Sequence, residues 1–94
     1  MAQLKRYMIE REVPGIGQMS VTELCGAARA SNQALDQIGT NIQWVHSYVA
    51  NDKTFCIYLA DSEDSIRKHY ELSGIPVAGI TEVPQVIDPL TANN

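Results

Sequence analysis

Most of the side chains in this sequence that could do chemistry lie in one short stretch, residues 44–60 (WVHSYVANDKTFCIYLA). It places His46 and Tyr48 on one segment, and Cys56 and Tyr58 on the next. Imidazole suits divalent transition metals, and a thiol and phenols beside it would add further donor atoms. Whether these side chains form a site depends on whether they meet on one face of the protein.

The two segments are typical of paired β-strands, and the length of their turn decides which side chains share a face. A two- or four-residue turn places a mixed set together: Trp44, His46, Tyr48, Phe55, Ile57 and Leu59. A three-residue turn, Asn51-Asp52-Lys53, instead gives a purely apolar face of Val45, Val49, Phe55, Ile57 and Leu59. The other face then carries Trp44, His46, Tyr48, Cys56 and Tyr58. We predict the three-residue turn because it sorts the residues better, with Tyr58 opposite His46 and Cys56 opposite Tyr48.

Glu10, on a preceding strand, would add a carboxylate to this functional face if Glu10 and Met8 point the same way. The parity of that strand stays open, because Tyr7 and Ile9 compete with Leu4 and Met8 for the helix side. The alternative to a ligand site is a hydrogen-bonded polar network that serves only structure.

The elements that must position these residues follow from hydrophobic periodicity and capping signals. We predict strands at 4–12, 42–49, 54–59 and 80–87, and a helix at 20–38 that begins with the capping-box pair Ser20 and Glu23. A second helix is capped by Asp61 or Ser62 and runs to residue 73. Gly39 and Gly74 end the helices, the second just before Pro76, and a tail starts at about residue 90.

This order, β-α-β-β-α-β, predicts a single α+β domain over residues 1–94 with the ferredoxin-like fold. The sheet is antiparallel in the order 4-1-3-2, with both helices on one face. Pro84 cannot donate a hydrogen bond to a neighbouring strand, so the fourth strand should lie at an edge.

The predicted functional face has no helix to cover it. Large aromatic side chains are rarely left together in water on a monomer. We therefore predict a homodimer in which two sheets pack face to face and enclose these residues in a barrel-like interior.

Composition excludes several classes of partner. The net charge is −4 and Lys and Arg are not clustered, which argues against nucleic acid. The N-terminal MAQLKRYMIERE lacks the apolar core of a signal peptide, and no run approaches the roughly 18 apolar residues of a membrane span. We expect a cytoplasmic protein whose cysteines, Cys25 and Cys56, are free thiols packed as small hydrophobic residues.

The sequence also carries a set of short patterns: RY, ERE and PG near the start, then WVHSYV, CIY, IRKH, GIP and VIDP. Together they resemble a family of small bacterial nickel-binding proteins, and the resemblance covers nearly the whole chain. It implies a dimeric ferredoxin-like α+β barrel that binds a divalent metal, nickel in particular, without catalysis. Leu59 departs from the pattern, because an acidic residue is expected there.

His69 is similar to a recurring position of that family, which implies a secondary ligand. Its place near the boundary between core and solvent favours a surface or capping role instead. The predicted metal ligands are His46, Cys56, Tyr48, Glu10 and His69, and the predicted cavity-lining residues are Trp44, Tyr58 and Met8.

Two other functions stay open at this stage. Dimeric α+β barrels also include cofactor-free oxygenases and isomerases that act on a small molecule between the sheets, with His46 as base and Trp44 and Tyr58 as walls. The third possibility is a purely structural dimer with a filled interior.

Overall fold

The computed structural model describes residues 3–39, 41–74 and 77–93 and has the predicted order of helices and strands. The strands are β1 (Lys5–Glu12), β2 (Ile42–Val49), β3 (Lys53–Ala60) and β4 (Gly79–Glu82); the α-helices are α1 (Val21–Ile38) and α2 (Glu63–Ser73). Two short 3-10 helices, η1 (Ile16–Gln18) and η2 (Pro89–Asn93), were not predicted. The predicted turn around Pro76 lies outside the described residues.

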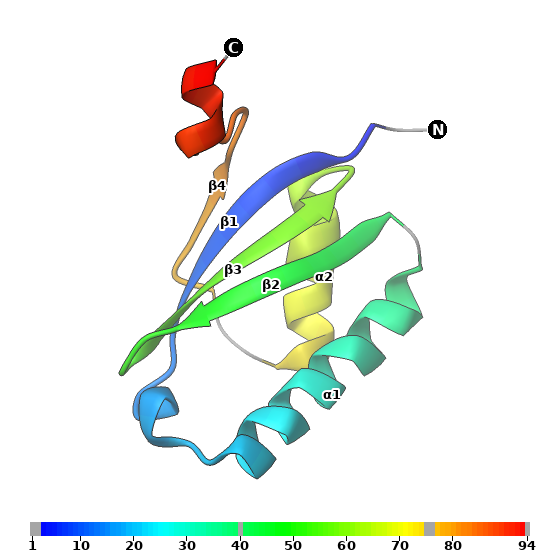
Figure 1. The fold of residues 1–94 in the computed structure, drawn as a ribbon. Helices are drawn as coiled ribbons and strands as arrows, with labels where there is room; N and C mark the ends of the chain where they lie inside the picture. The colour runs from blue at the N-terminus through cyan, green and yellow to red at the C-terminus, as the bar shows by residue number, and fades with distance from the viewer. Residues whose placement is uncertain (1–2, 40, 75–76, 94) are drawn as a thin grey trace.

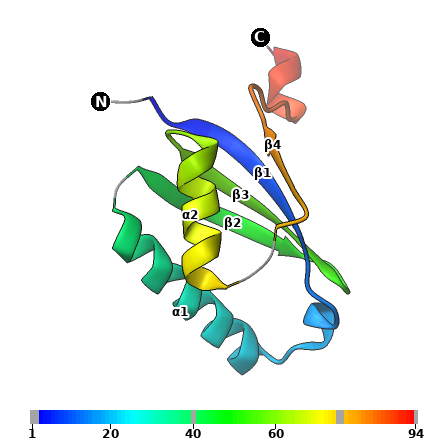
Figure 2. The ribbon, with the colours of Figure 1, turned by 180° about the vertical axis from the view of Figure 1, so that it is seen from behind.

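The four strands form one antiparallel sheet in the order β2-β3-β1-β4, which is the predicted 4-1-3-2 counted from the other edge. Both α-helices lie over the same face of this sheet (Figures 1 and 2). β4 is an edge strand, as Pro84 indicated, but it ends at Glu82 rather than at residue 87. We call the side of the sheet under the helices the helix side, and the other side the open face.

Local capping chemistry fixes the helix ends. Ser20 and Glu23 form the predicted capping box, in which each side chain accepts a hydrogen bond from the other residue's backbone N–H, at 3.2 and 3.1 Å. Ser62 caps α2, and Gly74 ends it in the left-handed conformation that glycine adopts without strain (φ 74°). Gly39 also has a positive φ, but its ψ of −149° lies outside the predicted left-handed helical region.

The core lies between the sheet and the helices. Tyr7 and Ile9 of β1 point to the helix side, which settles the parity of that strand and places Met8 and Glu10 on the open face. The other buried members of the core cluster come from β2, β3 and α2: Ile42, Cys56, Tyr58, Ala60, Ile66 and Tyr70.

The hairpin between β2 and β3 does not have the predicted three-residue turn. Ala50 N–H donates to the carbonyl of Lys53 at 2.9 Å, so the turn itself contains only Asn51 and Asp52. Beyond the turn the pairing shifts by one residue at Val45, between Trp44 and His46. Such a bulge reverses the side to which the following residues point.

A close backbone approach holds this turn against η1. The N–H groups of Val13 and Gly17 donate to the carbonyls of Asp52 and Asn51, each at 2.9 Å, and Gly15 N–H donates to the Asp52 carboxylate. A Cβ atom on Gly17 would lie 2.6 Å from the Cα of Asn51 and 2.8 Å from the carbonyl oxygen of Ala50. Only glycine fits there without a shift of the backbone.

We expect Gly17→Ala to lower the free energy of unfolding by about 1–3 kcal/mol, because a methyl group is forced against backbone that cannot give way. Urea unfolding measures this change. The matched control is Gly26→Ala, where the new Cβ meets no atom within 4 Å. That site is inside α1, so alanine should raise stability by about 0.5–1 kcal/mol. Equal effects of the two variants would contradict the close approach.

Three smaller findings complete the fold. The predicted tail is the exposed helix η2, and the Asp88 carboxylate accepts hydrogen bonds from the N–H groups of Leu90 and Thr91. Both cysteines are free as predicted, but Cys25 is exposed rather than packed. Among the described residues, no helix has the length and apolar character needed to cross a membrane.

Candidate functional site

The open face carries a histidine–tyrosine pair on β2. His46 and Tyr48 are both exposed, with Nε2 of the imidazole 3.1 Å from the tyrosine hydroxyl. Their rings meet edge to face with centroids 5.0 Å apart. The pair can therefore reach a ligand without any change in the core.

The strand register places two rows of side chains around this pair. One row runs Met8, Ile57, His46 across β1, β3 and β2, and the next runs Glu10, Phe55, Tyr48. Glu10 lies 3.8 Å from the ammonium of Lys53, a weak exposed ion pair. The open face is thus apolar along β3, with polar groups on both sides of it.

The helix side carries a second polar group, centred on His69. This side chain is fully buried, and its Nε2 lies 3.2 Å from the hydroxyl of Tyr58 and 3.3 Å from that of Ser31. Nδ1 of His69 has no hydrogen-bond partner among the described residues. Burial lowers the pKa of His69 to about 4, and the nearby positive charge of Arg11 adds to this effect. His69 is therefore neutral at physiological pH.

Arg11 of β1 lies next to this histidine, and 8% of its surface is exposed. Its Nη2 donates to Sγ of Cys56 at 3.4 Å, and its guanidinium lies 5.0 Å from the centre of the Tyr70 ring, a cation–π contact. Burial raises the pKa values of both Tyr58 and Tyr70, so these phenols stay protonated. We call Arg11, Ser31, Cys56, Tyr58, His69 and Tyr70 the buried polar cluster.

The predicted site is therefore divided between two faces. His46, Tyr48, Glu10 and Met8 lie on the open face, whereas Cys56, Tyr58 and His69 are buried on the helix side. The partners predicted across the hairpin are also wrong: His46 pairs with Ile57, and Tyr48 with Phe55. The physical reason is the two-residue turn, which brings the even residues of β2 beside the odd residues of β3.

Trp44 lies before the bulge and pairs with Tyr58 on the helix side. The cavity proposed for an enzyme, with His46 between Trp44 and Tyr58, is consequently not formed, because the sheet separates the histidine from the other two. The prediction that His69 lies at the surface is also wrong.

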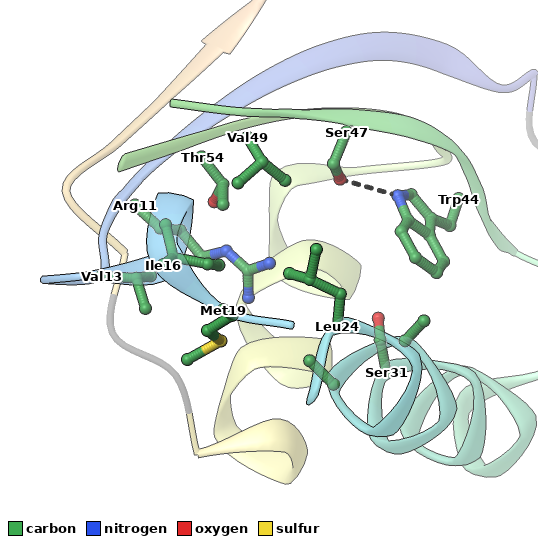
Figure 3. A pocket seen from close by; sticks show the side chains of 12 residues that line it. Arg11, Val13, Ile16, Met19, Leu24, Ser31, Trp44, Ser47, Val49 and Thr54 are labelled. Carbon is green, nitrogen blue, oxygen red and sulfur yellow. Dashed lines mark hydrogen bonds between the residues drawn. The ribbon is translucent and has the colours of Figure 1, made fainter. Parts of the chain in front are cut away.

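Trp44 instead lines a pocket of about 350 Å³ between α1 and the sheet (Figure 3). Its indole N–H donates to the hydroxyl of Ser47 at 2.9 Å. The lining is mainly apolar and comes from β1, η1, α1, β2, β3 and the loops beside η1: Arg11, Val13, Ile16, Met19, Leu24, Ala27, Ala28, Ser31, Trp44, Ser47, Val49 and Thr54. The pocket is on the side of the sheet away from His46.

Sequence reasoning did not identify Arg11 or Ser31 as functional candidates. The alternation Tyr7, Ile9, Arg11 on β1 is a signal that places Arg11 on the side of the core. His69 is three residues after Ile66 and precedes Tyr70, so the same helical stripe that is buried at those two positions includes the histidine.

Comparison with known proteins gives the family. Residues 7–83 match the family described as nickel responsive protein, SCO4226-like, which is most of the chain. The chain belongs to this family. The match confirms the resemblance that the short sequence patterns indicate.

A solved structure of the family's namesake agrees in fold. The crystal structure of SCO4226 from Streptomyces coelicolor A3(2) has a TM-score of 0.72, with 18% sequence identity over 87% of this chain and 99% of that chain. At that identity the similarity establishes the fold and not a shared site. The comparison with curated proteins found no match.

Proposed function

We propose that this member of the SCO4226-like family is a nickel-binding homodimer that holds the ion at the open face, around His46. The observation that carries the proposal is an exposed imidazole, paired with Tyr48 at 3.1 Å, on the sheet face opposite α1 and α2. Imidazole is a preferred ligand of Ni²⁺, and Nε2 of His46 can exchange the tyrosine hydroxyl for the ion.

The donor chemistry fits nickel for some of the predicted ligands only. His46 and Glu10 offer an imidazole and a carboxylate on neighbouring rows of the open face, and Tyr48 lies in the row of Glu10. Cys56 and His69 are buried on the other side of the sheet and are left out of the proposed site. Among the described residues, His, Cys, Asp and Glu side chains form no cluster of three.

A second copy of the chain would complete the ligand set. In a twofold dimer the same patch meets itself, so two open faces would contribute two copies of His46 and of Glu10. Apolar side chains along β3, with Phe55, Ile57 and Leu59 half-buried and Met8 exposed beside them, give such an interface its hydrophobic surface. The dimer would then be a ferredoxin-like α+β barrel.

The free thiols of Cys25 and Cys56 fit the cytoplasm, where thiols are kept reduced.

We expect isothermal titration with NiCl₂ to show saturable binding that His46→Ala weakens by at least about tenfold, because the variant removes the one imidazole of the face. Both proteins should carry Cys25→Ser, since that exposed thiol could bind nickel by itself. The matched control is Gln43→Ala, an exposed residue two strand positions before the bulge on β2, which should bind as the parent does. An isotherm unchanged by His46→Ala would remove this residue from the site.

A further inference from the structure

We propose that the pocket between α1 and the sheet binds a small amphipathic carboxylate, whose anionic end contacts Arg11 and whose apolar body fills the space beside Trp44. This inference is separate from nickel binding, because the pocket and His46 lie on opposite sides of the sheet. Either proposal can therefore fail without the other.

The first argument is the incomplete bonding of a buried cation. Arg11 is more than nine-tenths buried, yet its Nε and Nη1 have no hydrogen-bond partner among the described residues. The group it does reach through Nη2 is the sulfur of Cys56, a weak acceptor. Figure 3 shows the guanidinium extending into the pocket, between the strands and α1. A buried arginine without a carboxylate is costly, and a bound anion would offset that cost.

The second argument is the chemistry of the pocket walls. Apolar surface around the guanidinium comes from Leu24, Val49 and Met19. The lining of the pocket also includes two hydroxyl groups, those of Ser31 and Thr54. A carboxylate placed against Arg11 could accept hydrogen bonds from such hydroxyls as well. A few polar groups in a mainly apolar wall are typical of sites for small molecules.

The size of the pocket limits the ligand. At ~30 Å³ for each non-hydrogen atom, the share of one water molecule in the liquid, a volume of about 350 Å³ holds about a dozen such atoms. A straight-chain acid of ten carbons has this size. The chemical class is therefore a medium-chain or similarly sized apolar monocarboxylate.

Trp44 makes the proposal directly testable, because it is the one tryptophan of the chain and lines the pocket. Decanoate should change the tryptophan fluorescence in a saturable way, and isothermal titration should give the same dissociation constant. Decanol has the same carbon chain without the charge, so it lacks the charge-assisted hydrogen bond to Arg11. Loss of one such bond should weaken its binding to the wild-type protein at least about tenfold.

Arg11→Gln should weaken decanoate binding by about tenfold or more and leave decanol binding within about threefold. Ala28→Leu fills the pocket from α1 and keeps the arginine, so it should weaken both ligands. This second variant covers the case in which Arg11→Gln does not fold, which thermal unfolding followed by circular dichroism would reveal. The proposal is overturned if decanoate gives no saturable signal with wild-type protein, or if neither variant changes its affinity.

Discussion

Lowering the pH from 7.5 to 5 should reduce the free energy of unfolding by about 2 kcal/mol through the protonation of His69 alone. Burial lowers the pKa of this histidine to about 4 in the folded state, whereas its ordinary value is 6.5. Between these two values the unfolded chain binds a proton that the folded chain excludes. Stability therefore falls as the pH falls through this window.

The surroundings of His69 give no compensation in that range. The charged group beside it is Arg11, which further disfavours the imidazolium. Tyr58 and Tyr70 touch its ring, and both have raised pKa values, so they remain neutral. A hydrogen bond from Ser65 lowers the pKa of the Asp61 carboxyl below its ordinary value of 3.8. The stability that Asp61 contributes to the fold is therefore lost only below that pH.

Urea unfolding at several pH values measures the effect, with His69→Gln as the test variant. Glutamine keeps hydrogen-bonding groups near Ser31 and Tyr58 but does not titrate, so the loss between pH 7.5 and 5 should largely disappear. The matched control is Lys68→Gln, at the exposed position just before His69 on α2, which leaves the histidine in place and should keep the slope. A slope that is the same in wild type and His69→Gln would contradict the assignment.

The parts of the fold that the sequence predicted well depend on local chemistry. The capping box of Ser20 and Glu23, the cap at Ser62 and the left-handed Gly74 each involve residues close together in the chain. Their geometry requires no knowledge of the partners across the core. The strand order followed from the same elements, because few ways exist to connect βαββαβ without crossing.

The hairpin register failed for a physical reason that concerns Phe55, Ile57 and Leu59. The prediction assumed that one apolar face of β3 must lie under the helices. The structure instead buries Cys56 and Tyr58 there and turns the larger apolar side chains to the open face. The thiol of Cys56 and the hydroxyl of Tyr58 have hydrogen-bond partners on that side, Arg11 and His69, and the sequence pattern does not reveal these pairings.

The bulge at Val45 and the environment of His69 were missed because both depend on distant contacts. The bulge lets Trp44 share the helix side with Tyr58 while His46 points the other way. The partner of His69 on α1, Ser31, is 38 residues earlier in the chain. The contacts of Nε2 with Ser31 and Tyr58 allow His69 to occupy a buried helical position that periodicity alone assigns to an apolar residue.

Ile57→Glu should convert the proposed dimer to a monomer. Ile57 is the middle residue of the row that joins Met8 and His46, so it would lie near the centre of two apposed open faces. An unpaired carboxylate buried there costs about 3 kcal/mol or more, which raises the dimer dissociation constant by at least about a hundredfold. Sedimentation equilibrium over a range of protein concentrations measures this change.

The matched control is Val21→Glu, which adds the same charge at a side chain that is 85% exposed, in the first turn of α1. A carboxylate in the first turn interacts favourably with the helix dipole, so this variant should fold and keep the wild-type association. A monomeric wild-type protein, or an Ile57→Glu variant that still dimerises, would contradict the proposed use of the open face.

The Ile57→Glu variant also tests whether nickel binding depends on association of two copies. If one ion takes ligands from two copies, nickel should tighten the wild-type dimer and the Ile57→Glu protein should bind nickel more weakly, although His46 is intact. If each copy binds its own ion, the monomeric variant should bind nickel at least as tightly as wild type, because the introduced carboxylate lies opposite His46 and is itself a nickel ligand. Since the introduced carboxylate can add a nickel ligand and the replaced isoleucine side chain supplied none, a weaker nickel affinity in this variant comes from loss of the second copy or from a local change at His46. The edge-to-face contact of His46 with Tyr48 offers a spectroscopic control for the local change.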